Sequence, residues 1–225
     1  MVLRLGVLQG MSSTTTRNSS SADDKPRNRY HHGDLRRSLI DTGLVLVQEV
    51  GVEAISLRVL AERVGVSTPA LYHHFKNKQQ LLFALGEASV DIFQIQLNQE
   101  LIREKSDFSI ERFVLLYVRF AIENPELYEL MFGRQMWIGE QQSDFHRKAK
   151  QSFRLSAERL LVAQQAGQLP SSVNPLRLAQ VAWATLHGLC RMYNDGLAFT
   201  PETIEEIAKY ACQLMQQAVL AEAAS

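Results

Sequence analysis

Apolar residues recur every three or four positions along most of the chain that follows residue 33. This spacing places them on one face of a helix, whereas a strand would require alternation. The first stripe, in residues 34–50, comprises Leu35, Leu39, Ile40, Thr42, Leu46, Val47 and Val50. We therefore expect a helix over 34–50 that buries this stripe and ends at Gly51, since glycine readily adopts the left-handed conformation found after helix ends.

Two short helices are predicted after this first one. Ser56 and Ser67 are favoured N-cap residues, and Gly65 separates the two segments. The first short helix has an apolar face made of Leu57, Leu60, Ala61 and Val64. The second, over 68–75, buries Leu71 and Phe75, which lie four residues apart. Two short helices joined by three residues form a helix-turn-helix unit.

The rest of the chain continues the helical pattern to its end. Further apolar stripes predict helices over about 77–101, 110–123, 126–132, 142–167, 174–193 and 201–222. We predict an all-α fold, with a three-helix head that contains the helix-turn-helix and a larger helical C-terminal domain. The expected division is a flexible basic arm over 1–30, a helix-turn-helix head over 31–78 and a helical body over 79–225.

Charge is distributed unevenly although the formal net charge of the 225 residues is zero. Residues 1–82 hold 11 Lys and Arg against 7 Asp and Glu, whereas residues 83–225 hold 13 against 17. A basic head is suited to nucleic acid, because contacts with phosphates supply most of the sequence-independent affinity for DNA. Lys25, Arg27 and Arg29 make the end of the arm basic, and we expect Arg27 and Arg29 to reach a minor groove.

Composition excludes several other classes of protein. With 46% hydrophobic and 21% charged residues, the chain is not of the disordered class. The sequence has no run of 18 apolar residues, so no membrane span is predicted. Residues 1–10 lack the features of a signal peptide. Cys190 and Cys212 show no spacing typical of a metal site or a disulfide framework. We expect a cytoplasmic protein without a cofactor, whose translation starts at Met1 or at Met11.

Residues 33–82 resemble the DNA-binding domain of the TetR family of transcriptional regulators. The resemblance is carried by the segment 56–78, SLRVLAERVGVSTPALYHHFKNK, in which the family's positions follow one another without a gap: Ala61, Gly65, Val66, Leu71, Tyr72, His74, Phe75 and Lys78. Residues 29–36, RYHHGDLR, and 183–189, WATLHGL, resemble a TetR subgroup with a Trp, His and Gly signature in its C-terminal domain.

The second helix of the helix-turn-helix carries the residues that we expect to face DNA. If Leu71 and Phe75 are buried, the opposite side projects into a major groove, and it carries Thr68, Pro69, Tyr72 and His73. Three further residues are expected to contact the phosphate backbone: Ser56, Arg58 and Lys78. His74 lies between the two buried positions, so packing is expected there more than contact with a base.

The resemblance implies a C-terminal domain that dimerises through its last two helices and holds a small-molecule ligand. The segment 174–193 is apolar on nearly every side, which independently favours a second partner surface. A stripe suited to close packing in a four-helix interface comprises Ile204, Ala208, Ala211, Met215 and Ala218. An ordinary core is the alternative for this stripe. The candidate ligand-pocket residues are Tyr117, Phe120, Trp137, Trp183, His187 and Arg191.

The favoured function is a transcriptional repressor that binds a near-palindromic operator in double-stranded DNA as a homodimer and is released by a small-molecule effector. The alternative is a helical interaction protein without a ligand response. No Gly-x-Ser-x-Gly, phosphate-binding glycine loop or His-Glu-x-x-His motif is present, so an enzyme is not expected. The adjacent pairs His31-His32 and His73-His74 do not indicate a metal site, because neighbours in a helix point about 100° apart and no carboxylate or cysteine completes a set of ligands.

Overall fold

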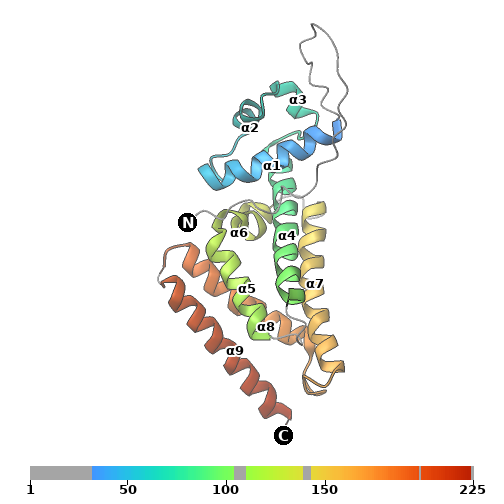
Figure 1. Cartoon of the computed structure of the whole chain (residues 1–225), viewed down its shortest axis with the longest axis vertical. Helices are drawn as coiled ribbons and strands as arrows, with labels where there is room; N and C mark the ends of the chain where they lie inside the picture. The colour runs from blue at the N-terminus through green and yellow to red at the C-terminus, as the bar shows by residue number, and fades with distance from the viewer. Residues whose placement is uncertain (1–31, 104–109, 139–142, 198, 224–225) are drawn as a thin grey trace, which may run out of the picture.

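The computed structural model describes residues 32–103, 110–138, 143–197 and 199–223. Within these ranges it contains nine α-helices, one short 3-10 helix and no strand, which confirms the predicted all-α fold (Figure 1). The elements are α1 (His32–Val50), α2 (Leu57–Val64), α3 (Thr68–Tyr72), α4 (Lys78–Arg103), α5 (Ile110–Glu123), α6 (Pro125–Phe132), η1 (Arg134–Met136), α7 (Asp144–Gln165), α8 (Pro175–Asn194) and α9 (Pro201–Ala223).

The head consists of α1, α2 and α3, packed at one end of α4 (Figure 1). The hydroxyl oxygen of Ser56 accepts a hydrogen bond from the Val59 amide at 3.2 Å, so Ser56 caps α2 as predicted. Gly65 ends α2 in the left-handed conformation, with φ of 77°. The Ser67 hydroxyl caps α3 in the same manner as Ser56 caps α2. These caps fix where α2 and α3 begin, and Gly65 fixes where α2 ends before the turn.

Two details of the head differ from the sequence prediction. The helix expected over 68–75 ends at Tyr72, because the chain turns there and the His74 amide bonds to the carbonyl three residues before it, that of Leu71, in a tighter turn. Phe75 is nevertheless buried, beneath the Arg36 guanidinium, which lies 5.4 Å from the ring centroid. Val50, expected on the buried stripe, is 45% exposed, whereas Val47 in the same turn is fully buried.

The body is built around α4, which extends from the head into the C-terminal helices (Figure 1). It packs against α6 and α7, and more lightly against α5 and α1. Phe83 of α4 stacks on Phe145 of α7 at a centroid distance of 5.8 Å. Gly86 lies where α4 approaches α6 most closely, since an added Cβ would be 2.8 Å from the Leu130 carbonyl oxygen. A single buried apolar cluster therefore extends from the head into the body.

The last two helices, α8 and α9, lie along the outer side of α5 (Figure 1). The prediction that the small-residue stripe of α9 forms a dimer interface is partly wrong. Ile204 and Ala208 are fully buried in the chain's own core, where α9 packs against α5. An ion pair between Arg119 and Glu205, at 2.8 Å, also joins these two helices. The first part of this stripe is therefore buried against α5 of the same chain.

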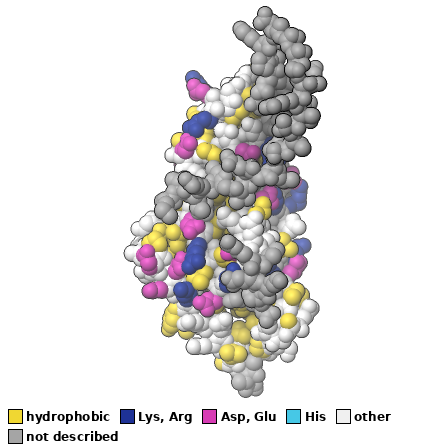
Figure 2. Space-filling model, viewed as in Figure 1, with side chains coloured by type: hydrophobic (Ala, Val, Ile, Leu, Met, Phe, Trp, Pro, Cys, Tyr) yellow, Lys and Arg dark blue, Asp and Glu magenta, His cyan; other side chains and the backbone are white. Residues whose placement is uncertain are grey.

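The exposed faces of α8 and α9 are nevertheless rich in large apolar side chains. They carry Leu176, Val181, Trp183, Met192, Tyr210, Leu214 and Leu220. On the face shown in Figure 2, hydrophobic side chains reach the surface of the body between Lys, Arg, Asp and Glu. The cysteines Cys190 and Cys212 are buried and free. No helix in the described ranges is long and apolar enough to cross a bilayer.

Candidate nucleic-acid interface and ligand cavity

The structure brings the four expected groove-facing residues together on the outer side of α3. Leu71 is fully buried against the head, and the opposite side exposes Thr68, Pro69, Tyr72 and His73. Tyr72 has 49% of its surface exposed, which is unusual for a large aromatic residue beside a core. The face combines hydroxyl, imidazole and apolar groups, which are the types that contact base edges and thymine methyl groups.

The expected backbone contacts lie at the starts of α2 and α4. Arg58 is exposed in the first turn of α2, next to the capping residue Ser56. Lys78 is the first residue of α4, and its Nζ donates a hydrogen bond to the Glu53 carbonyl at 2.6 Å. An ammonium group has three donors, so this bond holds Lys78 in place and leaves donors for a phosphate. The arm residues Lys25, Arg27 and Arg29 lie outside the described residues.

Helix α4 begins with a reciprocal pair of side-chain caps. The Asn77 side-chain oxygen accepts from the Gln80 amide at 2.9 Å, and the Gln80 side-chain oxygen accepts from the Lys76 amide at 3.0 Å. This arrangement satisfies two amide groups that a helix start leaves unpaired. It fixes where α4 starts and therefore where Lys78 lies relative to α3.

The body contains a cavity of about 720 Å³ bounded by helices α4 to α8. This volume is within the range of cavities that hold small molecules. Tyr117, Trp137 and Trp183 line it, as the sequence predicted, and so do Phe113 and Phe153. A smaller apolar cavity of about 260 Å³ adjoins it and shares the wall residues Ile110, Leu160 and Ala182.

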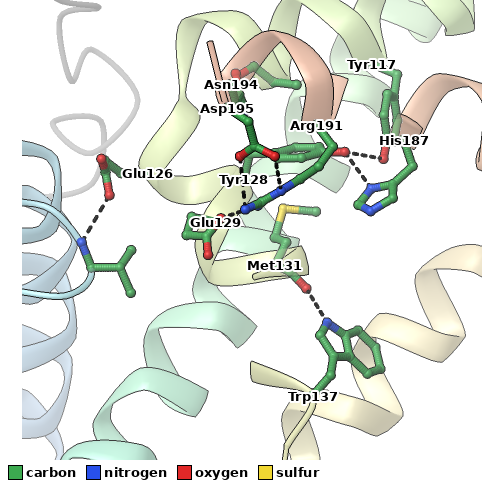
Figure 3. Close-up of polar contacts among 12 residues, drawn as sticks. Tyr117, Glu126, Tyr128, Glu129, Met131, Trp137, His187, Arg191, Asn194 and Asp195 are labelled. Atoms are coloured by element: carbon green, nitrogen blue, oxygen red, sulfur yellow. Dashed lines mark hydrogen bonds and ion pairs between the residues drawn. The ribbon is translucent and has the colours of Figure 1, made fainter. Parts of the chain in front are cut away.

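The other three expected pocket residues, Phe120, His187 and Arg191, do not line this cavity. Phe120 is buried behind Phe93, with ring centroids 5.0 Å apart. Arg191 is held by ion pairs with Glu129 and Asp195 (Figure 3). The hydrogen bond with Glu129 is the main cause of the raised pKa of Arg191. Arg191 therefore joins α8 to α6, and its charge is neutralised at that contact.

A chain of hydrogen-bonding groups leads from the cavity wall to His187. The hydroxyl oxygens of Tyr117 and Tyr128 lie 3.4 Å apart, and that of Tyr128 lies 2.6 Å from Nδ1 of His187 (Figure 3). The His187 ring also stacks on Trp183 at 5.1 Å. Burial raises the pKa of both tyrosines, and burial followed by the charge of Arg191 lowers the pKa of His187. These groups are therefore uncharged at neutral pH.

Tyr128 was missed as a site residue by sequence reasoning. It lies in a short apolar helix, where an aromatic residue is typical of an ordinary core, and His187 follows it by 59 residues. The same helix, α6, also contacts the head: a Glu126 carboxylate oxygen accepts a hydrogen bond from the Val52 amide at 3.0 Å. Helix α6 therefore lies between the large cavity and the connection between α1 and α2.

Comparison with known proteins identifies the family. The profile of the bacterial regulatory proteins of the tetR family matches residues 39–85. The profile of a tetracyclin repressor-like C-terminal domain matches residues 110–215. The chain belongs to the TetR family. The two matches cover the helix-turn-helix and nearly all of α5 to α9; the Trp-His-Gly subgroup stays a prediction.

Individual TetR-family relatives differ in how much of the chain they match. The class C tetracycline repressor protein of Escherichia coli is 54% identical over 57 residues, which is 25% of this chain and 26% of that protein. The regulator AcrR of Shigella flexneri is 24% identical over 83% of this chain and 90% of its own. The chain thus matches only about a quarter of the length of these tetracycline repressors.

Solved structures of similar fold cover the chain more fully. A Rhodococcus sp. RHA1 protein of unknown function has a TM-score of 0.70 and 27% identity, over 86% of this chain and 99% of its own. A TetR-family transcriptional regulator from Pectobacterium atrosepticum has a TM-score of 0.64 and 20% identity, over 86% and 97%. These likenesses extend the TetR-type arrangement of head and helical body to the described part of the chain.

Proposed function

We propose that the protein is a transcriptional repressor that binds a near-palindromic operator as a homodimer and is released by a small-molecule effector. In this proposal residues 31–78 bind DNA and residues 79–225 dimerise and hold the effector. The observation that carries it is the exposed face of α3, with its hydroxyl, imidazole and apolar groups, fixed between two capped helices in a chain of the TetR family. Such a protein acts where the bacterial DNA is, in the cytoplasm.

Helix α3 would enter the major groove, which is about 12 Å wide and admits one α-helix. Thr68 and Pro69 are then the candidates for reading base edges and thymine methyl groups. Tyr72, His73, Ser56, Arg58 and Lys78 are the candidates for phosphate contacts or for support of the reading residues. All seven lie at the outer surface of the head or at the starts of α2 and α4.

Dimerisation would use the exposed apolar faces of α8 and α9. Val181 and Met192 on α8, with Tyr210 and Leu214 on α9, are too large and too exposed to be explained by the chain's own core. Two copies related by a twofold axis would cover these faces in a four-helix interface. A twofold dimer reads two half-sites, which explains why a near-palindromic operator is expected.

The proposal is tested by fluorescence anisotropy with DNA that flanks the protein's own gene. We expect a salt-sensitive complex with one such fragment and much weaker binding to unrelated DNA. Tyr72→Ala should weaken this complex at least tenfold, whereas Val50→Ala, which truncates an equally exposed residue at the far end of α1, should not. Absence of a complex with any flanking DNA would instead favour the alternative, a helical interaction protein.

A further inference from the structure

The charged groups of the large cavity are of one sign. Its wall includes two basic side chains, Lys150 and Arg154, and no Asp or Glu. Both lie on α7 and both are exposed, so they are at the solvent-facing edge of the cavity. Residues four apart on a helix are neighbours, and like charges at this spacing repel each other. An anion placed between them would relieve that repulsion.

The two residues differ from the other cations in the first half of α7. Arg147 pairs with Asp144, and Lys148 pairs with Asp91 of α4. Neither Lys150 nor Arg154 forms an ion pair with any residue that the structure describes. After burial, the positive charge of Lys150 is the next cause of the lowered pKa of His146. Lys150 therefore keeps an uncompensated positive charge at the cavity wall among the residues that the structure describes.

The remaining wall is mostly apolar, with rings from Phe93, Phe113, Phe132, Phe153 and Trp183. The Tyr117 hydroxyl lies beside that of Tyr128, and the Gln180 side-chain oxygen accepts a hydrogen bond from Arg177. The two serine hydroxyls of the wall are already engaged. The Ser152 hydroxyl accepts from the Gln94 side chain at 2.5 Å, and the Ser156 hydroxyl donates to the Ser152 carbonyl at 3.3 Å. A ligand with an extended apolar body would gain from burial among the rings, and a polar body would find few partners.

We propose that the cavity binds a monocarboxylate with an apolar body, whose carboxylate pairs with Lys150 and Arg154 and whose body lies among the aromatic rings. A guanidinium can hold a carboxylate through two parallel hydrogen bonds, and an ammonium adds a third donor nearby. The inference rests on the proposed function only in taking this ligand to be the effector. A cationic ligand would meet two like charges and no counter-charge.

Intrinsic fluorescence provides a direct reporter for this site. The chain has two tryptophans, Trp137 and Trp183, and both line the cavity. The full-length protein is titrated at pH 7.5 with decanoate, 1-decanol and decylamine, which share a ten-carbon body and differ in charge. None of them absorbs at the excitation wavelength of tryptophan, so a change in emission reports occupancy of the wall.

We expect decanoate to bind at least about tenfold more tightly than decanol, and decylamine to bind most weakly, since tenfold corresponds to about 1.4 kcal/mol. In Lys150→Gln/Arg154→Gln the preference for decanoate over decanol should fall below about twofold. The matched control, Arg147→Gln/Lys148→Gln, removes the same charge from the same helix outside the cavity wall. It should keep the preference.

Three results would overturn the inference: equal affinity for decanoate and decanol, tighter binding of decylamine, or no binding of decanoate up to its solubility limit. A preference that survives in Lys150→Gln/Arg154→Gln would also overturn it, because the selectivity would then come from elsewhere. A measurement of operator affinity with and without decanoate separates failure of this ligand site from failure of the proposed function. If decanoate binds with the expected selectivity and leaves operator affinity unchanged, the ligand site stands and effector release by this class fails.

Discussion

Lys78 is the first residue of α4, and its ammonium group donates a hydrogen bond to the Glu53 carbonyl of the head. The remaining donors of this group can contact a DNA phosphate. Each phosphate contact contributes about 0.9 to the slope of log affinity against log salt concentration. Lys78→Gln should therefore reduce the slope by about 0.9 per half-site, as measured by anisotropy between 50 and 200 mM salt. Lys148→Gln, which removes a charge from α7 far from α3, is the control. An unchanged slope in Lys78→Gln would remove Lys78 from the contacts.

His187 makes stability depend on pH because burial, followed by the charge of Arg191, lowers its pKa in the folded state below 6.5. The unfolded chain then binds a proton at a higher pH than the folded chain does. The stabilisation is complete above about pH 6.5 and is lost as the pH falls toward the lower folded pKa. Urea unfolding at pH 7.5 and 5.5 should show a smaller loss of stability for His187→Gln than for the wild type. Equal losses would show that His187 does not titrate differently on folding.

Helix α6 connects two regions of the molecule, through Glu126 to the head and through Tyr128 and Glu129 to α8. Glu126→Ala leaves the amide of the buried residue Val52 without its acceptor, which should lower the free energy of unfolding by about 1 kcal/mol. Glu126→Gln keeps an acceptor oxygen and should cost less. Hydrogen exchange measured at the Val52 amide should speed up in the alanine variant alone. Equal exchange in both variants would contradict a role for this contact.

Helix α4 tolerates little added volume where it crosses α6 and α7. A Cβ at Gly86 would lie 2.8 Å from both the Leu130 carbonyl oxygen and a Phe145 ring carbon. Gly86→Ala should therefore lower the free energy of unfolding by about 1–3 kcal/mol. Gly43→Ala is the comparison, since its new Cβ would meet only the end of the Leu85 side chain, which can rotate away. Urea unfolding of the two variants measures the difference, and a smaller loss for Gly86→Ala would contradict the close approach.

In the proposed homodimer, the exposed apolar faces of α8 and α9 form the interface between the two copies. Tyr210 and Leu214 are 61% and 48% exposed in the single chain. Tyr210→Glu/Leu214→Glu should convert a dimer to a monomer, because paired interfaces would bury four uncompensated charges. Light scattering coupled to gel filtration measures the mass. Val162→Glu, at a 63% exposed position on α7, should leave the mass unchanged; a dimer in both variants would place the interface elsewhere.

The distance between the two heads of such a dimer is governed by α4. Its 26 residues correspond to about 39 Å, so a small tilt at the cavity end moves the head by several ångströms. Two recognition helices must lie about 34 Å apart to enter successive major grooves. A ligand that binds one tilt better than the other by about 2.7 kcal/mol would change operator affinity about 100-fold. The contacts from Tyr117 to Tyr128 on α6, and from Glu126 on α6 to the head, would be one physical route for such coupling.

Local chemistry was enough to predict the helices and the helix-turn-helix. Ser56 and Ser67 act as caps, Gly65 ends α2, and the apolar spacing selected Leu71 and Phe75 for burial. These features depend on neighbours within four residues, so they can be read along the chain. The exposed face of α3 follows from them, because the burial of one side of a helix leaves the other side to solvent.

Contacts between distant segments were decided only by tertiary packing. The sequence shows that Arg191 is charged, but only the fold brings Glu129 beside it and removes it from the cavity. Helical spacing marks Ile204 and Ala208 as one face, and packing against α5 decides that the chain itself buries that face. Lys150 and Arg154 are exposed on α7, and only the placement of α5 and α8 brings an apolar cavity wall beside them. Helical periodicity specifies which side of a helix is apolar, whereas the partner of that side depends on the relative placement of whole helices.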